Sequence, residues 1–97
     1  MRKSYIVDGM LSGTGMRDAI EGGYIEPQHL QVSPILLKRI ALWLSKYEQA
    51  HFHQFEDGEQ NTKLDCEGLE IAAALQSELL DATIEYFSAA KLIKLPF

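Results

Sequence analysis

A glycine-rich segment near the start of the chain has the residue types of an anion or small-ligand site. Residues 9–15 follow an apolar stretch that ends at Asp8, and Arg17 comes two residues later. If a helix begins after this loop, its free backbone N–H groups can hold an anion, and Arg17 adds positive charge. The glycines match neither the dinucleotide-binding nor the P-loop pattern, so nucleotide hydrolysis is not predicted. A plain flexible turn is the alternative to a ligand site made of Asp8, Ser12, Gly13, Thr14, Gly15 and Arg17.

The stretch from residue 56 to residue 85 is strongly acidic. It holds nine acids and one base, Lys63, and carries a charge of −8, whereas five acids and eight bases give the rest of the chain +3. A field of one sign speeds association with a partner of the opposite sign. Phe52 and Phe55 stand just before it and can act as anchors. A solvated acidic helix face is the alternative to a partner-binding surface made of Phe52, Phe55, Glu56, Asp57, Glu59, Asp65, Glu67 and Glu70.

Histidine and cysteine side chains are few, and their spacing favours structure over chemistry. His51 and His53 point apart on a helix, so together they bind one metal ion only if the chain is extended there. Cys66 sits at a predicted helix N-terminus, which stabilises a thiolate, but two flanking acids oppose that charge. Asp8 is the most enzyme-like carboxylate, yet no second catalytic group stands beside it. We therefore predict no catalytic residues, no metal site and no cofactor, and enzymatic activity is the less favoured interpretation.

Length and composition fit one globular domain spanning residues 1–97. An apolar share of 46% and a charged share of 24% are ordinary for a folded protein of 97 residues. No window approaches the roughly 18 apolar residues that a membrane span needs. The net charge of −5 argues against nucleic-acid binding, and a single cysteine cannot form an internal disulfide. We therefore expect a cytoplasmic protein that binds neither membranes nor nucleic acids.

The longest element that the sequence predicts is a helix between Ser33 and Phe55. Ser33 is a suitable N-cap and Pro34 a suitable first helical residue. Apolar residues recur every three or four positions, and Leu42 and Trp43 outside that stripe widen the apolar arc. We therefore expect this helix to be covered on more than one side, at the centre of the core. The pattern before it predicts a strand over residues 3–8, a short helix over 16–21 that Gly22 and Gly23 stop, and an irregular connector over 24–32.

The second half of the chain predicts a further helix and a strand. Asp65 is the expected N-cap of the helix. The residues around Ile84 are β-branched and aromatic, which favours a strand, but no strong helix breaker precedes them, so a helix that runs on through Tyr86 is the alternative. The predicted elements are a polar loop (56–62), a helix from Asp65 to near Asp81, a strand (83–87), a turn capped by Ser88 (89–92) and a tail that is apolar enough to dock, with its role left open (92–97).

The order strand–helix–helix–helix–strand indicates a small, helix-rich α/β domain, with α+β as the alternative class. Two strands separated by helices most simply lie parallel and are joined by a crossover. A two-stranded sheet is not stable alone, so we expect a third strand from the tail or from Tyr24–Ile25, or an edge paired with a second subunit in a homodimer.

In size, charge and its acid-rich helix and loop, the chain resembles immunity proteins, the small partners that neutralise toxic nucleases and related effectors. The acidic residues carry the resemblance together with Phe52 and Phe55. It implies a protein-interaction module, an immunity-like or antitoxin-like inhibitor, that binds a basic partner such as a toxin. The alternative function is a small-ligand-binding, anion-binding or enzymatic domain that uses the glycine-rich loop, residues 9–15. The residues behind the resemblance are Phe52, Phe55, Glu56, Asp57, Glu59, Asp65, Glu67 and Glu70.

Overall fold

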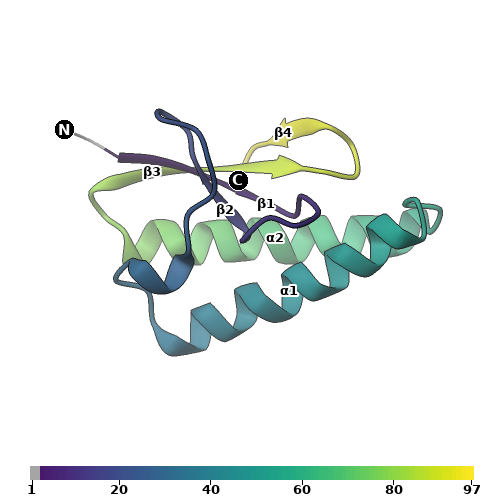
Figure 1. Cartoon of the computed structure of the whole chain (residues 1–97), viewed down its shortest axis with the longest axis horizontal. Helices are drawn as coiled ribbons and strands as arrows, with labels where there is room; N and C mark the ends of the chain where they lie inside the picture. Colours follow the sequence, from purple (N-terminus) through teal and green to yellow (C-terminus); the bar gives the residue numbers. More distant parts are fainter. Residues whose placement is uncertain (1–2) are drawn as a thin grey trace.

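The computed structural model describes residues 3–97, which form a four-stranded mixed sheet and a pair of helices (Figure 1). The strands follow the order β2-β1-β3-β4 across the sheet. This small α+β arrangement confirms the predicted fold class, although the sheet has more strands than the two or three expected. The elements are β1 (Lys3–Asp8), β2 (Met16–Asp18), the 3₁₀ turn η1 (Pro27–His29), α1 (Pro34–Phe52), α2 (Gly58–Glu78), β3 (Ala82–Ser88) and β4 (Ile93–Leu95).

The centre of the sheet is a parallel pair. β1 and β3 run side by side from Lys3 opposite Ala82 to Asp8 opposite Phe87, and both helices lie in the connection between them. The parallel arrangement expected from the element order is therefore confirmed. The two outer strands are antiparallel to their neighbours, and the apolar tail supplies one of them, β4.

The short helix predicted over residues 16–21 is wrong, because this segment forms β2 and a turn. Met16 is fully buried and pairs with Val7 of β1. The Asp18 carboxylate accepts hydrogen bonds from the backbone N–H groups of Ile20 and Glu21, which closes the turn. Tertiary pairing with the free edge of β1 therefore outweighs the weak helical pattern.

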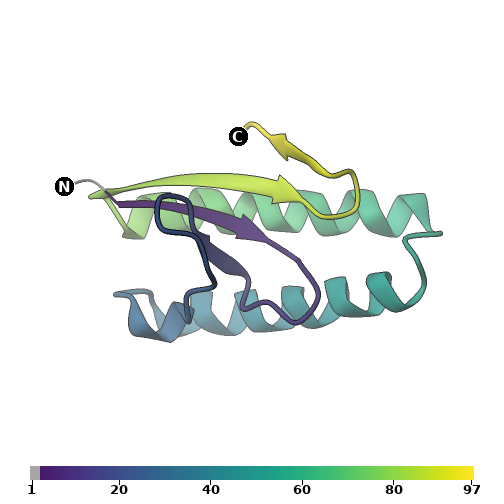
Figure 2. The ribbon, with the colours of Figure 1, turned by 45° about the horizontal axis from the view of Figure 1, so that its top comes forward.

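The cap of α1 is confirmed, but its place in the core differs from the prediction. The Ser33 hydroxyl accepts a hydrogen bond from the Leu36 N–H, and Pro34 is the first helical residue. α1 packs against α2, and α2 packs against β3 and β1, so the backbone of α2 lies closer to the sheet than that of α1 (Figure 2). The Trp43 ring of α1 still reaches Tyr86 of β3, at a centroid distance of 6.2 Å. The outer side of α1 is open, with Ile35 and Leu42 exposed. The buried face of α1 consists of Leu36, Ile40, Trp43, Tyr47 and Ala50.

α2 begins earlier than predicted, so the expected polar loop over residues 56–62 is mostly helix. Asp57 is its N-cap and accepts a hydrogen bond from the Gln60 N–H, whereas Asp65 lies in the helix interior. The prediction that Asp65 caps the helix is wrong, and Cys66 is therefore not at a helix N-terminus. α2 ends at Glu78, and a strand follows it, not a continued helix, because that segment pairs with β1.

The apolar tail supplies the fourth strand. Ser88 caps the turn before it, since its hydroxyl accepts a hydrogen bond from the Lys91 N–H at 3.1 Å. The tail then pairs along β3, with Leu95 opposite Tyr86. Tyr24 contributes only an isolated bridge to Arg17. Within residues 3–97, no helix has the length and hydropathy of a membrane span.

Candidate interaction surface

The turn between α1 and α2 is held in a single conformation by backbone and side-chain hydrogen bonds. Gln54 and Phe55 adopt positive φ angles of 55° and 54°, which reverse the chain within a few residues. The Phe55 N–H donates to the Ala50 carbonyl at 2.9 Å, and the Asn61 side-chain amide donates to the Phe55 carbonyl at 2.8 Å. Together with the Asp57 cap, these bonds tie the end of α1 to the first turns of α2.

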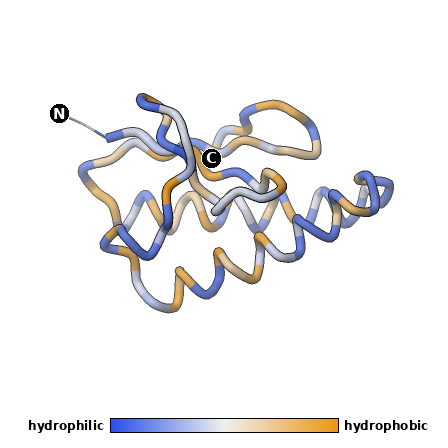
Figure 3. Tube along the Cα trace, viewed as in Figure 1, coloured by the Kyte–Doolittle hydropathy of each residue, from blue (hydrophilic) through white to orange (hydrophobic). Residues whose placement is uncertain are grey.

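Most of the predicted partner-binding residues near this turn are exposed. Phe52 ends α1 with 63% of its surface accessible. Glu56, Asp57 and Glu59 follow within seven residues, and all three are exposed. The tube through this end of the molecule is coloured mostly as hydrophilic (Figure 3). We call Phe52, Glu56, Asp57 and Glu59 the turn surface.

Phe55, unlike Phe52, packs against other side chains of the domain. Its ring packs edge-on against Tyr47 at a centroid distance of 6.0 Å and against His51 at 4.7 Å. His51 in turn places its Nε2 2.8 Å from the Gly9 carbonyl. Phe55 therefore joins the end of α1 to the glycine-rich loop, and only part of its ring is open to solvent.

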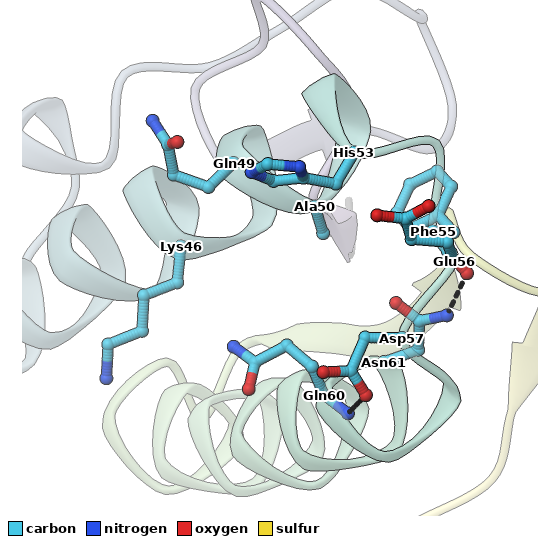
Figure 4. A pocket seen from close by; sticks show the side chains of 9 residues that line it. All are labelled: Lys46, Gln49, Ala50, His53, Phe55, Glu56, Asp57, Gln60 and Asn61. Atoms are coloured by element: carbon cyan, nitrogen blue, oxygen red, sulfur yellow. Dashed lines mark hydrogen bonds between the residues drawn. The ribbon is translucent and has the colours of Figure 1, made fainter.

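A pocket of about 350 Å³ lies beside the turn surface, between the last turns of α1 and the first of α2 (Figure 4). Glu56 and Phe55 line one end of it, and Lys46 lies at the opposite end. The charge of the lining is therefore mixed, with acids on the side of the turn. Its residues are Lys46, Gln49, Ala50, His53, Phe55, Glu56, Asp57, Gln60 and Asn61.

The acids farther along α2 are engaged within the chain. Arg39 of α1 donates two hydrogen bonds to Glu67, at 2.5 and 3.0 Å, and one to Glu70 at 3.1 Å. The guanidinium lowers the pKa of Glu67 below its usual value, and the hydrogen bond to Glu67 raises the pKa of Arg39. Arg39 balances one of their two negative charges, so these two acids contribute less to the outward field than the sequence suggests.

Asp65, also predicted to face a partner, is buried in the core. Only 4% of its surface is accessible. The hydroxyls of Tyr47 and Tyr86 donate to its Oδ1 at 2.9 and 2.7 Å, and the Ser88 hydroxyl donates to Oδ2 at 2.8 Å. Asp65 therefore cannot contact a partner, and it joins α1, α2 and β3 instead.

The hydrogen atoms of this network can be assigned from its geometry. The Tyr47 hydroxyl accepts from the Ala90 N–H, and the Ser88 hydroxyl accepts from the Lys91 N–H, both at 3.1 Å. Each hydroxyl has a single hydrogen, which is thus free to point at Asp65. The arrangement suits a carboxylate, which can only accept. Burial, together with Asp65, raises the pKa of the Tyr47 and Tyr86 phenols.

A spacing signal in the sequence could have identified this buried acid. The buried residues of α2 recur at helical intervals, and Asp65 falls within that stripe between Leu64 and Gly68. A Cβ on Gly68 would collide with the ring of Tyr86, so the glycine makes room for this side chain. Because buried polar groups are hydrogen-bonded, an acid within the apolar stripe of a helix indicates a buried polar contact.

The glycine-rich loop does not have the form expected of an anion site. A strand follows it, so no helix N-terminus points at the loop. Asp8 is completely buried and accepts hydrogen bonds from Arg17 Nε and the Met10 N–H. Arg17 also lies over the ring of Phe87, 5.7 Å from its centroid. Asp8 at the end of β1 is therefore in an ion pair with Arg17 within the chain.

The remaining loop residues have structural contacts or lie on its outside. The Thr14 hydroxyl lies within hydrogen-bond distance of the Met16 and Ile25 carbonyls, at 3.0 and 2.5 Å. Gly15 has φ 95°, and a Cβ there would touch Ile40 of α1. Ser12, at φ 64°, is exposed, and Gly13 packs against the Tyr24 ring. The loop therefore docks on the domain.

Among residues 3–97, no three His, Cys, Asp or Glu side chains are grouped closely enough to hold a metal ion. Comparison of the chain with models of known protein families and with curated proteins gave no match.

Proposed function

We propose that this chain is a protein-interaction module that binds a basic partner through the turn surface. The observation that carries the proposal is the exposure of Phe52 and, within the next seven residues, of three acids, Glu56, Asp57 and Glu59. An exposed aromatic side chain with exposed charges of one sign close to it in the sequence fits an interface anchor with a polar rim.

The stiffness of the turn supports this proposal. The hydrogen bonds of Phe55 and Asn61 fix the backbone between the helices, and Asp57 caps α2 with its side chain. A surface that is ordered before binding loses little conformational entropy when the partner arrives. The adjoining pocket gives space for a partner side chain, which should enter from the side of Glu56, because Lys46 repels a cation at the other end.

An immunity-like or antitoxin-like inhibitor is the functional class that we favour. Such proteins are small and acidic, and they act by covering a basic surface of their target. Cys66 is a free, exposed thiol, which suits the reducing conditions of a cytoplasm. We accordingly propose a cytoplasmic inhibitor whose target carries Lys and Arg around an apolar pocket that receives Phe52.

The test compares capture of partners by immobilised wild type and by two charge variants. The first variant carries Glu56→Gln, Asp57→Asn and Glu59→Gln, which removes the three acids and keeps a capping side chain on α2. The matched control loses the same charge elsewhere. Its substitutions are Glu21→Gln, Glu26→Gln and Asp81→Asn, all at exposed positions.

We expect one basic protein from the source lysate to bind the wild type and the control variant in a fixed ratio, and to be lost from the turn variant. Raising the salt from 50 to 300 mM, on the order of a twofold change in Debye length, should release it. Equal capture by the turn and control variants would refute the turn surface as the binding site. Absence of any basic partner would refute the inhibitor class.

A further inference from the structure

The first half of β3 lacks a strand neighbour on one side. β4 pairs with β3 only from Tyr86 to Ser88, so within residues 3–97 the backbone of Ala82–Glu85 has no strand on the β4 side. The Gln76 side chain of α2 occupies part of that edge. Its Nε2 donates to the Ala82 carbonyl at 2.8 Å, and its Oε1 accepts from the Ile84 N–H at 3.1 Å.

These two hydrogen bonds reproduce the pattern of strand pairing. In a parallel pair, one residue donates to the carbonyl before its opposite residue and accepts from the N–H after it. The Gln76 carboxamide does the same around Thr83 and presents the same two groups as a peptide unit. It therefore satisfies the Ala82 carbonyl and the Ile84 N–H, two of the backbone groups that an incoming strand would use, while the Ala82 N–H already donates to the Leu79 carbonyl at 3.1 Å.

Without Gln76, this edge would be suited to pairing with a second copy of itself. An antiparallel pair centred on Thr83 places Ala82 of one copy opposite Ile84 of the other, twice, as two-fold symmetry requires. The two Thr83 side chains would meet, a favourable cross-strand pair. Glu85 would lie opposite Asp81, whose like charge limits the affinity.

We propose that Gln76 protects the edge of β3 and prevents strand addition by a second copy of this chain. Unpaired strand edges promote association, and proteins cover them with charges, prolines, loops or other elements. The pairing of β4 with β3 ends at Leu95 opposite Tyr86, so β4 does not pair with Ala82 or Ile84. This edge lies near the C-terminal end of α2, away from the turn surface, and the inference does not depend on the proposed function.

The test measures self-association of the purified chain. Gln76→Met keeps the length and helix propensity of the side chain but removes both hydrogen bonds. The control, Gln49→Met, makes the same change at an exposed position of α1. We expect sedimentation at up to about 1 mM chain to show Gln76→Met rising towards the mass of a dimer, a concentration range in which weak interfaces are populated. Wild type and Gln49→Met should keep the mass of one chain.

Two further measurements separate edge pairing from loss of folding. In dilute Gln76→Met, the Ile84 amide should exchange with solvent roughly tenfold faster than in wild type, because its acceptor is gone. Gln76→Lys lacks the same hydrogen bonds but carries a charge on the edge, and it should stay monomeric. The proposal is overturned if Gln76→Met associates no more than Gln49→Met, or if Gln76→Lys associates as strongly as Gln76→Met.

Discussion

The Tyr86 hydroxyl donates a hydrogen bond of 2.7 Å to the Asp65 carboxylate inside the core. A buried carboxylate of α2 is thereby bonded to β3 of the sheet. Within residues 3–97, no Lys or Arg side chain forms an ion pair with Asp65. Three neutral hydroxyl groups replace the water that the carboxylate loses on folding. A buried acid held in this way is costly to disturb, because each lost donor leaves an unsatisfied group in a medium of low dielectric constant.

Replacing Asp65 should destabilise the fold by an amount that depends on the donors left behind. We expect Asp65→Ala to lower the free energy of unfolding by about 3 kcal/mol or more, because three hydroxyls lose their acceptor. Asp65→Asn should cost about 1–3 kcal/mol, since its NH₂ group, placed at Oδ2, opposes the hydroxyl hydrogen of Ser88. Urea unfolding of the two variants measures both values.

A double variant tests that explanation. Ser88→Ala removes the opposing donor, so Asp65→Asn with Ser88→Ala should cost less than the sum of the two single changes. If Asp65→Asn alone is as stable as wild type, the carboxylate does not need three donors and the assignment of hydrogen atoms is wrong.

Gly68→Ala should be destabilising although alanine favours helices. A Cβ at this position meets the Tyr86 ring, which is fully buried and cannot move aside freely. A Cβ this close to the ring places the overpacking cost at the upper end of the usual range, about 3 kcal/mol, which exceeds the gain of about 1 kcal/mol in helix propensity. Gly58→Ala is the control, because nothing lies within 4 Å of its Cβ, and it should be neutral or stabilising. Equal effects at both positions would contradict the role of Gly68.

The buried phenols predict loss of stability at high pH. The pKa values of Tyr47 and Tyr86 are raised above the usual 10.0, chiefly by burial. In the unfolded chain both ionise near pH 10, whereas in the folded chain both stay protonated. Their contribution to the free energy of unfolding is therefore complete below pH 10 and is lost as the pH rises above 10. Tyrosinate absorbance for these residues should appear together with unfolding, and Tyr86→Phe should reduce the slope of stability against pH.

Much of the secondary structure could be predicted from local signals. Ser33 and Pro34 mark the start of α1 without ambiguity, and the β-branched and aromatic residues around Ile84 indicate β3. The parallel pairing of β1 and β3 followed from the helices between them. These features depend on residues close in sequence or on simple rules of connection.

The errors arose where distant segments decide the structure. Residues 16–18 become a strand because β1 offers an open edge, which no local pattern reveals. Asp65 resembles a helix cap in sequence, yet its three donors come from α1 and β3, 18 to 23 residues away. Gln76 is an ordinary helix residue by composition, and its role appears only when β3 lies beside it. Buried polar contacts of this kind are set by tertiary packing.

The ion pairs of Arg39 predict a modest loss of stability in acid. The pKa of Glu67 is lowered below its usual 4.5, mainly by the hydrogen bond from Arg39. Because the folded value is the lower one, the contribution is present above pH 4.5 and is lost as the pH falls through the folded pKa. Glu67→Gln should remove this part of the acid dependence and Glu59→Gln should not. The effect should be small, since the Glu67 side chain is partly exposed.

The two phenylalanines at the turn should separate stability from binding. Phe55 packs edge-on against Tyr47 and His51, so Phe55→Ala should cost about 2 kcal/mol of stability through lost burial and lost aromatic contacts. Phe52 is 63% exposed, and Phe52→Ala should change stability by less than about 0.5 kcal/mol.

Binding should show the opposite order. Once the basic partner is identified, Phe52→Ala should weaken its affinity by about 30-fold, the effect of losing a 2 kcal/mol anchor. Titration calorimetry at one salt concentration measures this difference, and thermal unfolding of each variant verifies that it is folded. A Phe52→Ala variant that binds as tightly as wild type would remove Phe52 from the interface. The acids alone would then have to account for binding, and affinity should vanish at high salt, because exposed charges are screened there.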